Sequence, residues 1–454
     1  MLAAGAFACR NDQAAEQPIA RRTTLRSCTT RLPGHRRDRP VRITVWHAEG
    51  GDRGRRLREL IASFDASRPD ITVAVEQTPG GRQDLLDRWR STGAAERPSI
   101  VALPEDTTRL LADSRQTVAP GRCFAEAVPE ALPVIEASWS VDGMVQAMPF
   151  AVSTPVLLYD RQAFRDAGLD PAEPPATLEE LRTAAERLVG KRVVPVGLLF
   201  DTGPKGGGTW FVEQWSAQVG ATVVNPGNGR RRSAVAARWA DGPAVEHLRW
   251  LRDMVADGLA RSVGSNVRGL DDLTALFADP QAAAMTLHTS GALGELNDAR
   301  GRDLDLGVAP LPGPGEGSLP GGVALWLAAD KSDDETRAAW ALEAYLGSAP
   351  VQARWAAATG YVPISREAAE AEPVRAAWRA HPELAVAYRA LADQGTSAAE
   401  LGMSVGPEQE VEQLLAGAVT SAALGADPRE ALTAAADDCD RLLAAYNDGH
   451  PERA

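Results

Sequence analysis

The sequence predicts an α/β protein with two compact lobes. At 454 residues, the chain is about three times as long as a usual domain, so more than one hydrophobic core is expected. Its folded part starts with a strand–helix–strand pattern, the unit of a parallel sheet covered by helices. Strand and helix patterns alternate as far as Asp330, after which helical segments with many alanines dominate.

The first unit is read from hydrophobic periodicity. Apolar residues alternate with polar ones over 41–45 and again over 71–75, which predicts two strands. Between them, the apolar residues of 57–64 repeat at helical spacing and predict a helix, which Pro69 and Asp70 end. Because a helix joins the two strands, we expect them to pair in parallel.

Further helices and strands follow in alternation. Thr177 and Glu180 have the spacing of a capping box, which predicts a helix from Leu178. Asp271 is expected to cap another helix that carries Leu273. Apolar runs predict buried strands at 100–103, 193–199, 282–287, 306–309 and 323–328.

Composition excludes several classes of protein. The 61 acidic residues exceed the 48 basic ones, and the net charge of −13 argues against a protein that neutralises nucleic-acid phosphates. No run of eighteen apolar residues exists, so no membrane-spanning helix is expected.

Metal and disulfide sites are not predicted either. The four cysteines, Cys9, Cys28, Cys123 and Cys439, have no CxxC spacing, and the six histidines are scattered. We therefore expect no metal and no cofactor, and we expect Cys123 and Cys439 to be separate thiols.

The first forty residues are expected to lie outside the folded part. Residues 2–9 are small or apolar and lead to Cys9, as at the end of a bacterial lipoprotein signal peptide, in which the cysteine is lipidated. An incidental cysteine in a frayed terminus is the alternative. Residues 10–40 are rich in arginine and turn-forming residues, and they predict a basic linker with too little apolar surface to fold.

No catalytic constellation is present. The glycine-rich stretch 203–209 has its lysine before the glycines, which is the wrong order for a phosphate-binding loop. The Gly-x-Ser-x-Gly and His-Glu-x-x-His motifs are both absent. A carboxylate pair for glycoside hydrolysis stays conceivable, but 61 acidic residues single out no such pair.

Aromatic usage points to carbohydrate binding instead. Eleven of the 24 aromatic residues are tryptophan, and Trp46, Trp210 and Tyr361 stand beside glycine or polar residues rather than inside apolar runs. Aromatic faces cover the C–H surfaces of sugars while a few polar groups bind their hydroxyls. Trp340 and Trp355 occur at helical spacing and are expected in the core.

One segment carries a recognisable resemblance. Residues 148–171, MPFAVSTPVLLYDRQAFRDAGLDP, are similar to the extracellular solute-binding proteins of ABC importers for sugars, and most similar to their glycerol-3-phosphate-binding branch. The resemblance covers residues 41 to about 445 in order. Weaker matches in the same order lie at 43–48, 284–291, 321–326 and 359–364.

The resemblance implies a two-lobe fold of the periplasmic-binding-protein type II, with hinge-linked lobes and a central cleft. One lobe is expected to contain residues 41–150 and 292–345. The other is expected to contain residues 151–291 and 346–454. Residues 1–40 are assigned to the signal remnant and the linker.

The resemblance also implies a binding site in the cleft. Glu105 is expected to accept hydrogen bonds from ligand hydroxyls, and the backbone amide of Gly322 to approach the ligand closely. Trp210 is expected to form an aromatic wall. The complete expected set of ligand-binding residues is Glu105, Ser153, Trp210, Thr289, Gly322 and Tyr361, with Arg82 as a further member.

Two departures from the glycerol-3-phosphate branch concern the ligand's charge. Arg82 stands where that branch has a tyrosine. Near residues 402–411, where the branch carries an arginine for the ligand, this chain has Glu400, Glu408 and Glu410. Loss of an arginine removes the bidentate partner that a phosphate prefers. We therefore favour a sugar or polyol over a phosphate monoester.

The predicted function is that of a non-catalytic receptor outside the cytoplasm. It would capture a carbohydrate, or a glycerol-3-phosphate or glycerophosphodiester type of solute, and deliver it to the permease subunits of an ABC importer. We expect a monomer that is held to the membrane only through a lipid anchor at Cys9. A secreted glycoside hydrolase is the alternative, and a structural or adhesion protein of the envelope is a second one.

Overall fold

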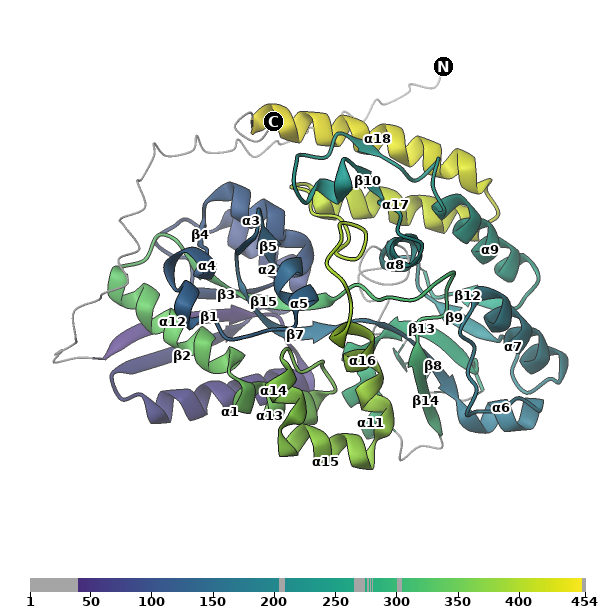
Figure 1. The fold of residues 1–454 in the computed structure, drawn as a ribbon, viewed down its shortest axis with the longest axis horizontal. Helices are drawn as coiled ribbons and strands as arrows, with labels where there is room; N and C mark the ends of the chain where they lie inside the picture. The colour runs from purple at the N-terminus through teal and green to yellow at the C-terminus, as the bar shows by residue number, and fades with distance from the viewer. Residues whose placement is uncertain are drawn as a thin grey trace, which may run out of the picture. The chain divides into compact units, whose positions relative to one another are not determined.

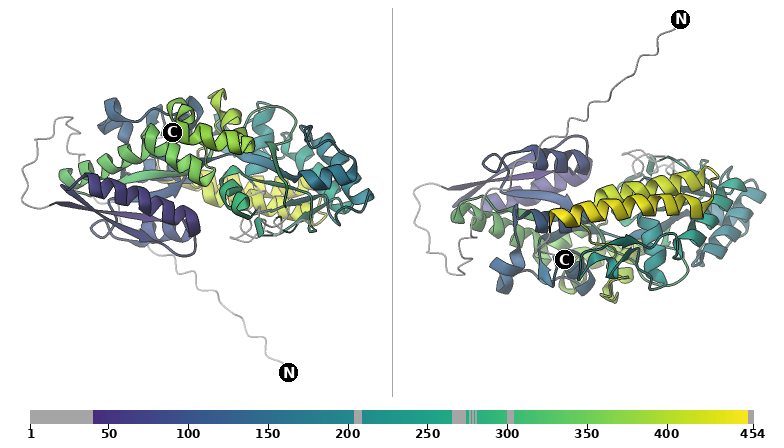
Figure 2. Two further views of the ribbon diagram at one scale, coloured as in Figure 1. Left: turned by 90° about the horizontal axis from the view of Figure 1, so that it is seen from below. Right: turned by 90° about the horizontal axis from the view of Figure 1, so that it is seen from above.

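The computed structural model describes residues 40–203, 209–264, 274, 275, 277, 279, 281–299 and 304–450, which belong to one compact unit. Cys9, the linker 10–39 and Asp271 with most of its expected helix lie outside these residues. Figures 1 and 2 show two β-sheets whose strands are joined and covered by helices.

The first sheet has six strands in the order β2-β1-β3-β15-β4, and β7 also pairs with β15. Strand β1 runs parallel to β2 and β3, whereas β15 is antiparallel to β3 and to β7. The bounds are β1 (Val41–His47), β2 (Ile71–Gln77), β3 (Ile100–Pro104), β4 (Thr117–Val118), β7 (Met148–Ser153) and β15 (Gly321–Ala328).

The second sheet has five strands in the order β12-β9-β13-β8-β14. Strand β8 is antiparallel to both of its neighbours, while β9 is parallel to β12 and β13. The bounds are β8 (Pro155–Asp160), β9 (Leu198–Phe200), β12 (Ala260–Ser262), β13 (Met285–Thr289) and β14 (Leu306–Pro310).

Amphipathic helices cover the sheets. In α1 (Gly51–Ser67), the predicted apolar stripe of 57–64 is buried, and the helix packs against β2 and α12 (Asp333–Gly347). Helix α7 (Leu178–Gly190) begins with the predicted capping box, because the Thr177 hydroxyl accepts from the Glu180 amide and the Glu180 carboxylate accepts from the Thr177 amide. Figure 1 shows α17 (Glu408–Ala423) and α18 (Pro428–Gly449) side by side.

The remaining elements are shorter or lie in connections. The helices are α2 (Arg82–Ser91), α3 (Thr108–Ser114), α4 (Pro120–Cys123), α5 (Pro133–Ser138), α6 (Arg161–Ala167), α8 (Trp210–Gln218), α9 (Ala244–Ala256), α11 (Leu293–Ala299), α13 (Ala349–Thr359), α14 (Arg366–Glu370), α15 (Glu372–Ala380) and α16 (Val386–Ala392). The 3-10 turns are η1 (Glu105–Thr107), η2 (Ala125–Ala127), η3 (Gly227–Gly229), η4 (Ser290–Ala292) and η6 (Pro382–Ala385). Two small hairpins are β5 (Ser140–Val141) with β6 (Met144–Val145), and β10 (Val224–Asn225) with β11 (Ala236–Ala237).

The pairing of the strands can be compared with the expected lobe boundaries, which remain a prediction. Strand β14 lies inside the segment 292–345 expected in the first lobe, yet it pairs with β8 of the second sheet. Helix α13, from the segment 346–454, packs against α1 beside the first sheet, whereas α17 packs against α9. The chain therefore passes between the two sheets more often than the expected boundaries provide for.

The passage from β7 to β8 joins the sheets directly. Only Thr154 separates the two strands, and its side chain is fully buried. The Thr154 hydroxyl donates to the Leu319 carbonyl at 3.0 Å and bonds the Ser318 hydroxyl, while its backbone N–H donates to Ser290 Oγ at 3.0 Å. These bonds fix the crossing point on the segments that precede β15 and follow β13.

Two expectations about single residues are resolved by the fold. Trp340 and Trp355 are buried as predicted. Cys439 is a buried free thiol; Cys123 is disulfide-bonded, though not to Cys439, so the expectation that both are thiols is wrong for Cys123. Among the described residues, no helix combines the length and the apolar character needed to cross a bilayer.

Candidate functional site

The carboxylate of Glu105 lies at the start of β15. Glu105 begins η1, directly after β3, and its Oε2 accepts from the Gly322 N–H at 2.8 Å. A Cβ atom on Gly322 would come within 2.0 Å of the Ala151 carbonyl oxygen, and the residue's φ of +126° also favours glycine. The amide expected to approach a ligand is thus held by Glu105 in this structure.

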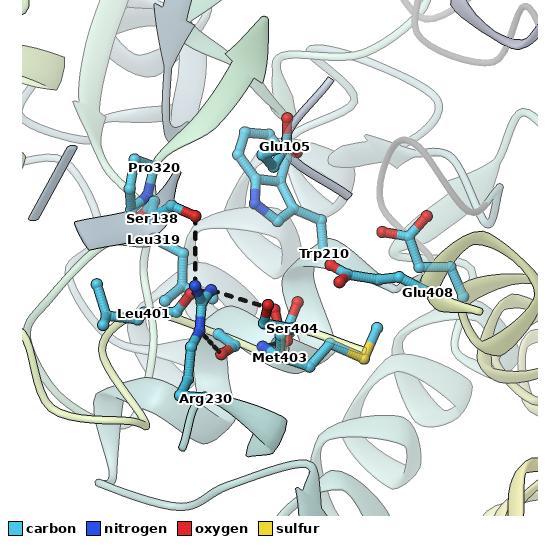
Figure 3. Close-up of a pocket in the computed structure, with 13 residues that line it drawn as sticks. Glu105, Ser138, Trp210, Arg230, Leu319, Pro320, Leu401, Met403, Ser404 and Glu408 are labelled. Atoms are coloured by element: carbon cyan, nitrogen blue, oxygen red, sulfur yellow. Dashed lines mark hydrogen bonds between the residues drawn. The ribbon is translucent and has the colours of Figure 1, made fainter. Parts of the chain in front are cut away.

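Trp210 lies beside Glu105 at the same strand end. A Cβ atom on Gly321 would be 2.9 Å from the Trp210 ring and 3.2 Å from Glu105 Oε1. The absence of a side chain at Gly321 therefore lets the indole of α8 and the carboxylate of η1 approach each other. Figure 3 shows Trp210 beside Glu105 at one side of a cavity.

A second group of side chains surrounds the Tyr361 hydroxyl. Arg82 Nη2 donates to Tyr361 Oη at 3.3 Å and to Glu49 Oε1 at 3.2 Å. Arg53 forms an ion pair with Glu49 at 3.2 Å. Burial raises the pKa of the Tyr361 hydroxyl, whose residue is 4% exposed, and the ring stacks on Trp355 at 5.7 Å between centroids.

Ser153 and Thr289 connect these two groups. Ser153 ends β7 opposite Gly321 of β15, and Val152, the preceding residue, pairs with Val362 next to Tyr361. Thr289 ends β13, and its hydroxyl accepts from the Gly291 N–H at 3.1 Å. Gly291 in turn lies against the Tyr361 ring, to which a Cβ there would approach within 3.1 Å.

The predicted residues therefore form one chain of contacts around the crossing of β7 and β15. The Arg82 guanidinium interacts electrostatically with both Glu49 and Glu105, which links the two groups. Only Glu105 and Trp210 of the predicted set line the cavity in Figure 3; the members outside its lining are Arg82, Ser153, Thr289, Gly322 and Tyr361. Cys9 lies outside the described residues.

The cavity is narrow in this structure: its volume is about 30 Å³, within about 440 Å³ of atom-free space that includes open solvent. Its walls come from η1, α8, the start of α17, the residues before β15 and the loop 401–404. Four glutamates and one arginine line it: Glu105, Glu213, Glu408, Glu412 and Arg230.

The Arg230 guanidinium is surrounded by backbone oxygens (Figure 3). Its Nε donates to the Gly402 carbonyl at 2.9 Å, and Nη1 donates to the Ser138 carbonyl at 3.3 Å. Nη2 donates to the carbonyls of Leu401 and Met403, the latter at 3.1 Å. Four of the five N–H groups of this guanidinium thus fix the loop 401–404 and join it to the end of α5.

Two of the four carboxyl groups of the cavity, those of Glu213 and Glu408, are buried. Burial, with the charges of Glu412 and Glu105, raises the pKa of Glu213 to about 7, although the Met403 N–H, which donates to its Oε1 at 2.6 Å, acts in the opposite direction. Burial also raises the pKa of Glu408 well above its usual value. Carboxyl groups in such an environment gain much from a ligand that supplies hydrogen-bond donors.

Sequence reasoning missed Glu213 and Arg230. Glu213 lies mid-helix in α8 next to apolar neighbours, and Arg230 is the first of three consecutive arginines, so no local pattern distinguishes either one. In the sequence, Glu408 marks only the place where the glycerol-3-phosphate branch carries an arginine. The structure brings a guanidinium to that place from a distant part of the chain, which a sequence without coordinates does not reveal. No cluster of three metal-binding side chains occurs among the described residues.

Two mixed sheets joined by crossing strands are the architecture of the periplasmic type II binding proteins. The chain belongs to the family of bacterial extracellular solute-binding proteins, whose model matches residues 59–386. These proteins are the substrate-binding components of ABC transporters, so the class predicted from the sequence is confirmed and the glycoside hydrolase alternative finds no support.

Individual relatives are distant in sequence. The sn-glycerol-3-phosphate-binding periplasmic protein UgpB of Yersinia pestis is 24% identical over 385 residues, which cover 82% of this chain and 85% of that protein. UgpB of Mycobacterium tuberculosis, solved with glycerophosphocholine, has a TM-score of 0.71 and 19% identity over 89% of this chain and 98% of that one. The GacH receptor of Streptomyces glaucescens, solved with acarbose, has a TM-score of 0.72 and 19% identity over 89% of this chain and 99% of that one. The structural matches establish the two-lobe fold.

Proposed function

We propose that the protein captures a small hydroxyl-rich solute, of the carbohydrate or glycerophosphodiester type, at the crossing of β7 and β15 and presents it to the permease subunits of an ABC importer. The observation that carries the proposal is the chain of contacts that gathers Glu105, Ser153, Trp210, Thr289, Gly322, Tyr361 and Arg82, seven residues from separate segments, around one place. Hydroxyl donors of a solute would bind the carboxylates, and the indole would cover its C–H surface.

The proposal includes how and where the protein works. It binds without catalysis, acts as a monomer outside the cytoplasm, and is tethered through a lipid on Cys9. Closure of the two lobes on the ligand would be a hinge motion, stabilised by contacts that the ligand makes to both sides at once.

A ligand screen tests the binding proposal. Sugars, polyols, glycerol phosphates and glycerophosphodiesters at millimolar concentration are added while the melting temperature and the tryptophan fluorescence are recorded. We expect at least one class to raise the melting temperature and to change the emission, because Trp210 lines the cavity. A panel that changes neither quantity would contradict solute capture.

Two substitutions test the site. Tyr361→Ala and Glu105→Ala are each expected to weaken binding of the identified solute by about 2 kcal/mol or more, because truncation of a desolvated contact residue removes the contact and leaves its partner unpaired. Glu430→Ala, at an exposed position of α18, is the matched control. Equal affinity of all four proteins, measured by calorimetry, would refute the site.

Turnover of chromogenic glycosides, lost on substitution of one carboxylate, would refute the absence of catalysis.

A further inference from the structure

The cavity in Figure 3 contains more carboxyl groups than its arginine can neutralise. Glu105 comes from η1, Glu213 from α8, and Glu408 and Glu412 from α17. Among the described residues that line the cavity, Arg230 is the one cation. The four carboxyl groups are close enough to perturb one another, since Glu213 responds to both Glu105 and Glu412.

Arg230 is in addition not available to an anionic ligand. Its guanidinium donates to four backbone carbonyls, which leaves at most one N–H for anything else. A phosphate monoester is bound best by two parallel N–H groups of a free guanidinium, and the described residues that line the cavity do not offer them.

The carboxyl groups, by contrast, keep acceptor capacity. Three of them each accept one backbone N–H, and no other hydrogen bond reaches them from the described residues: Glu105, Glu213 and Glu408. Glu213 and Glu408 are only 8% and 7% exposed. A ligand that enters the cavity would be the group that donates to them.

The aromatic wall fits a cation as well as a sugar face. Trp210 lies beside Glu105 in the lining of the cavity (Figure 3). A tryptophan ring attracts a cationic group through its quadrupole, and the attraction strengthens where water is excluded. An ammonium group at this place would meet the Trp210 indole and the Glu105 carboxylate together.

We propose that the solute of this site carries a positively charged nitrogen among its hydroxyl groups, and that the cavity lined by Glu105, Glu213, Glu408, Glu412 and Trp210 selects it over neutral and phosphate-monoester solutes. Amino sugars and choline esters of glycerol phosphate share this chemistry. The inference rests on the proposed function, because it names the solute class of the same site.

The pKa values of the carboxyl groups in the cavity predict how the binding of a cation depends on pH. Burial and Glu412 raise the pKa of Glu213 to about 7 and the pKa of Glu408 well above its usual value, while Arg230 lowers both. A bound cation stabilises the ionised carboxylates and lowers these pKa values, so binding releases protons. Affinity for a quaternary ammonium, which has no proton to lose, is therefore expected to rise from pH 5.5 to pH 8.

Isosteric pairs of solutes test the selection on the unaltered protein. Glycerophosphocholine is compared with its 3,3-dimethylbutyl ester, in which carbon replaces the charged nitrogen. Glucosamine is compared with glucose at pH 6.5, and glycerol 3-phosphate is the anionic probe. We expect the charged member of at least one pair to bind about tenfold or more tightly than its neutral isostere, and the pair that shows the preference identifies the source of the nitrogen.

Substitutions then assign the preference to the cavity. Glu213→Gln and Glu408→Gln keep the shape of the side chain and remove its charge, and each is expected to reduce the preference for the cation about tenfold and to flatten the pH dependence. Glu410→Gln, on the same helix but exposed, is the matched control and is expected to keep both. The melting temperature of each variant checks that it is folded.

The outcomes separate this inference from the proposed function. If neutral solutes bind and the charged isosteres bind no better in either pair, the selection is refuted while solute capture stands. Tighter binding of glycerol 3-phosphate than of every cation refutes it too. If none of the solutes binds, solute capture fails and the inference fails with it.

Discussion

At the scale of single residues, buried carboxyl groups dominate the chemistry of this protein. Glu343 of α12 is fully buried, and neither of its carboxyl oxygens has a hydrogen-bond partner among the described residues. Burial raises its pKa well above the usual value. Its ionisation is thus a cost that the folded state avoids by keeping the proton.

Glu343→Met is expected to raise the free energy of unfolding at pH 8 by about 1–3 kcal/mol, because it removes a buried polar group without opening a large cavity. Because the pKa of Glu343 is higher in the folded state than in the unfolded state, its carboxyl destabilises the fold least below the unfolded pKa. As pH rises toward the folded pKa, the unfolded state loses the proton first and the free energy of unfolding falls. The gain from the substitution should therefore be smaller at pH 5 than at pH 8. Urea unfolding at pH 5 and pH 8 measures this gain in stability, with exposed Glu367→Met as the control. An equal gain at the two pH values would contradict a raised pKa for Glu343.

At the scale of elements, Gly322 decides whether β15 and β7 can pair. Gly322→Ala is expected to cost about 2 kcal/mol or more, because the new Cβ would overlap the Ala151 carbonyl oxygen and the backbone is left-handed there. Gly143→Ala is the control, since its φ is also positive but no atom lies within 4 Å of its Cβ position. Denaturant unfolding of both variants compares them. An equal cost would mean that backbone strain alone, not the close approach of the strands, explains the effect.

The capping box of α7 gives a second prediction for an element. Thr177→Ala removes the acceptor of the Glu180 amide and is expected to lower stability by about 1 kcal/mol. Thr177→Ser keeps the hydroxyl and should restore most of it. Both values are read from urea midpoints, and an alanine variant as stable as the parent would show that the end of the helix is held by packing instead.

Elements were predictable from the sequence where burial follows a single period. The apolar stripe of α1 and the alternation of β1 and β2 have such a period, and all three form as predicted. The strand expected at 193–199 is confined to Leu198–Phe200, because Pro195 and the turn after α7 take up its first half. Strand β8 has no polar alternation, since both of its faces are buried, and its pairing with β13 and β14 comes from distant segments.

The site was predictable only in part for the same reason. The resemblance predicts Glu105, Gly322 and Tyr361, and the structure shows the Gly322 N–H bound to Glu105 and the Tyr361 hydroxyl bound to Arg82. Arg230 reaches the cavity through tertiary contacts with the loop 401–404, about 170 residues away in the chain. The spacing of neighbouring residues in the sequence does not indicate such a long-range contact.

At the scale of the whole molecule, contacts join segments beside different sheets. Arg109 of α3 donates to the Gly229 carbonyl at 3.3 Å, and Tyr446 of α18 donates to Asp113 of α3 at 2.7 Å. We expect these contacts to stabilise the closed arrangement. Their loss would make that arrangement less populated and would lower the apparent affinity for the ligand. The cavity itself contains none of these four residues.

We therefore expect the double variant Arg109→Met, Tyr446→Phe to bind the identified solute about five- to tenfold more weakly, although neither position lines the cavity. Calorimetry measures the affinity, and the melting temperature without ligand measures stability. Tyr388→Phe, whose hydroxyl makes no hydrogen bond among the described residues, is the control for loss of a hydroxyl. Unchanged affinity would mean that these contacts do not depend on closure.

The crossing at Thr154 has a consequence for anyone who wants to turn this receptor into a biosensor. Because one buried residue is all that separates β7 from β8, a reporter inserted there, or new termini opened there, would disrupt both sheets together. The exposed turn at Gly425, between the two long C-terminal helices, is a better point of entry. A fluorescent module placed there would leave the strands of both sheets intact.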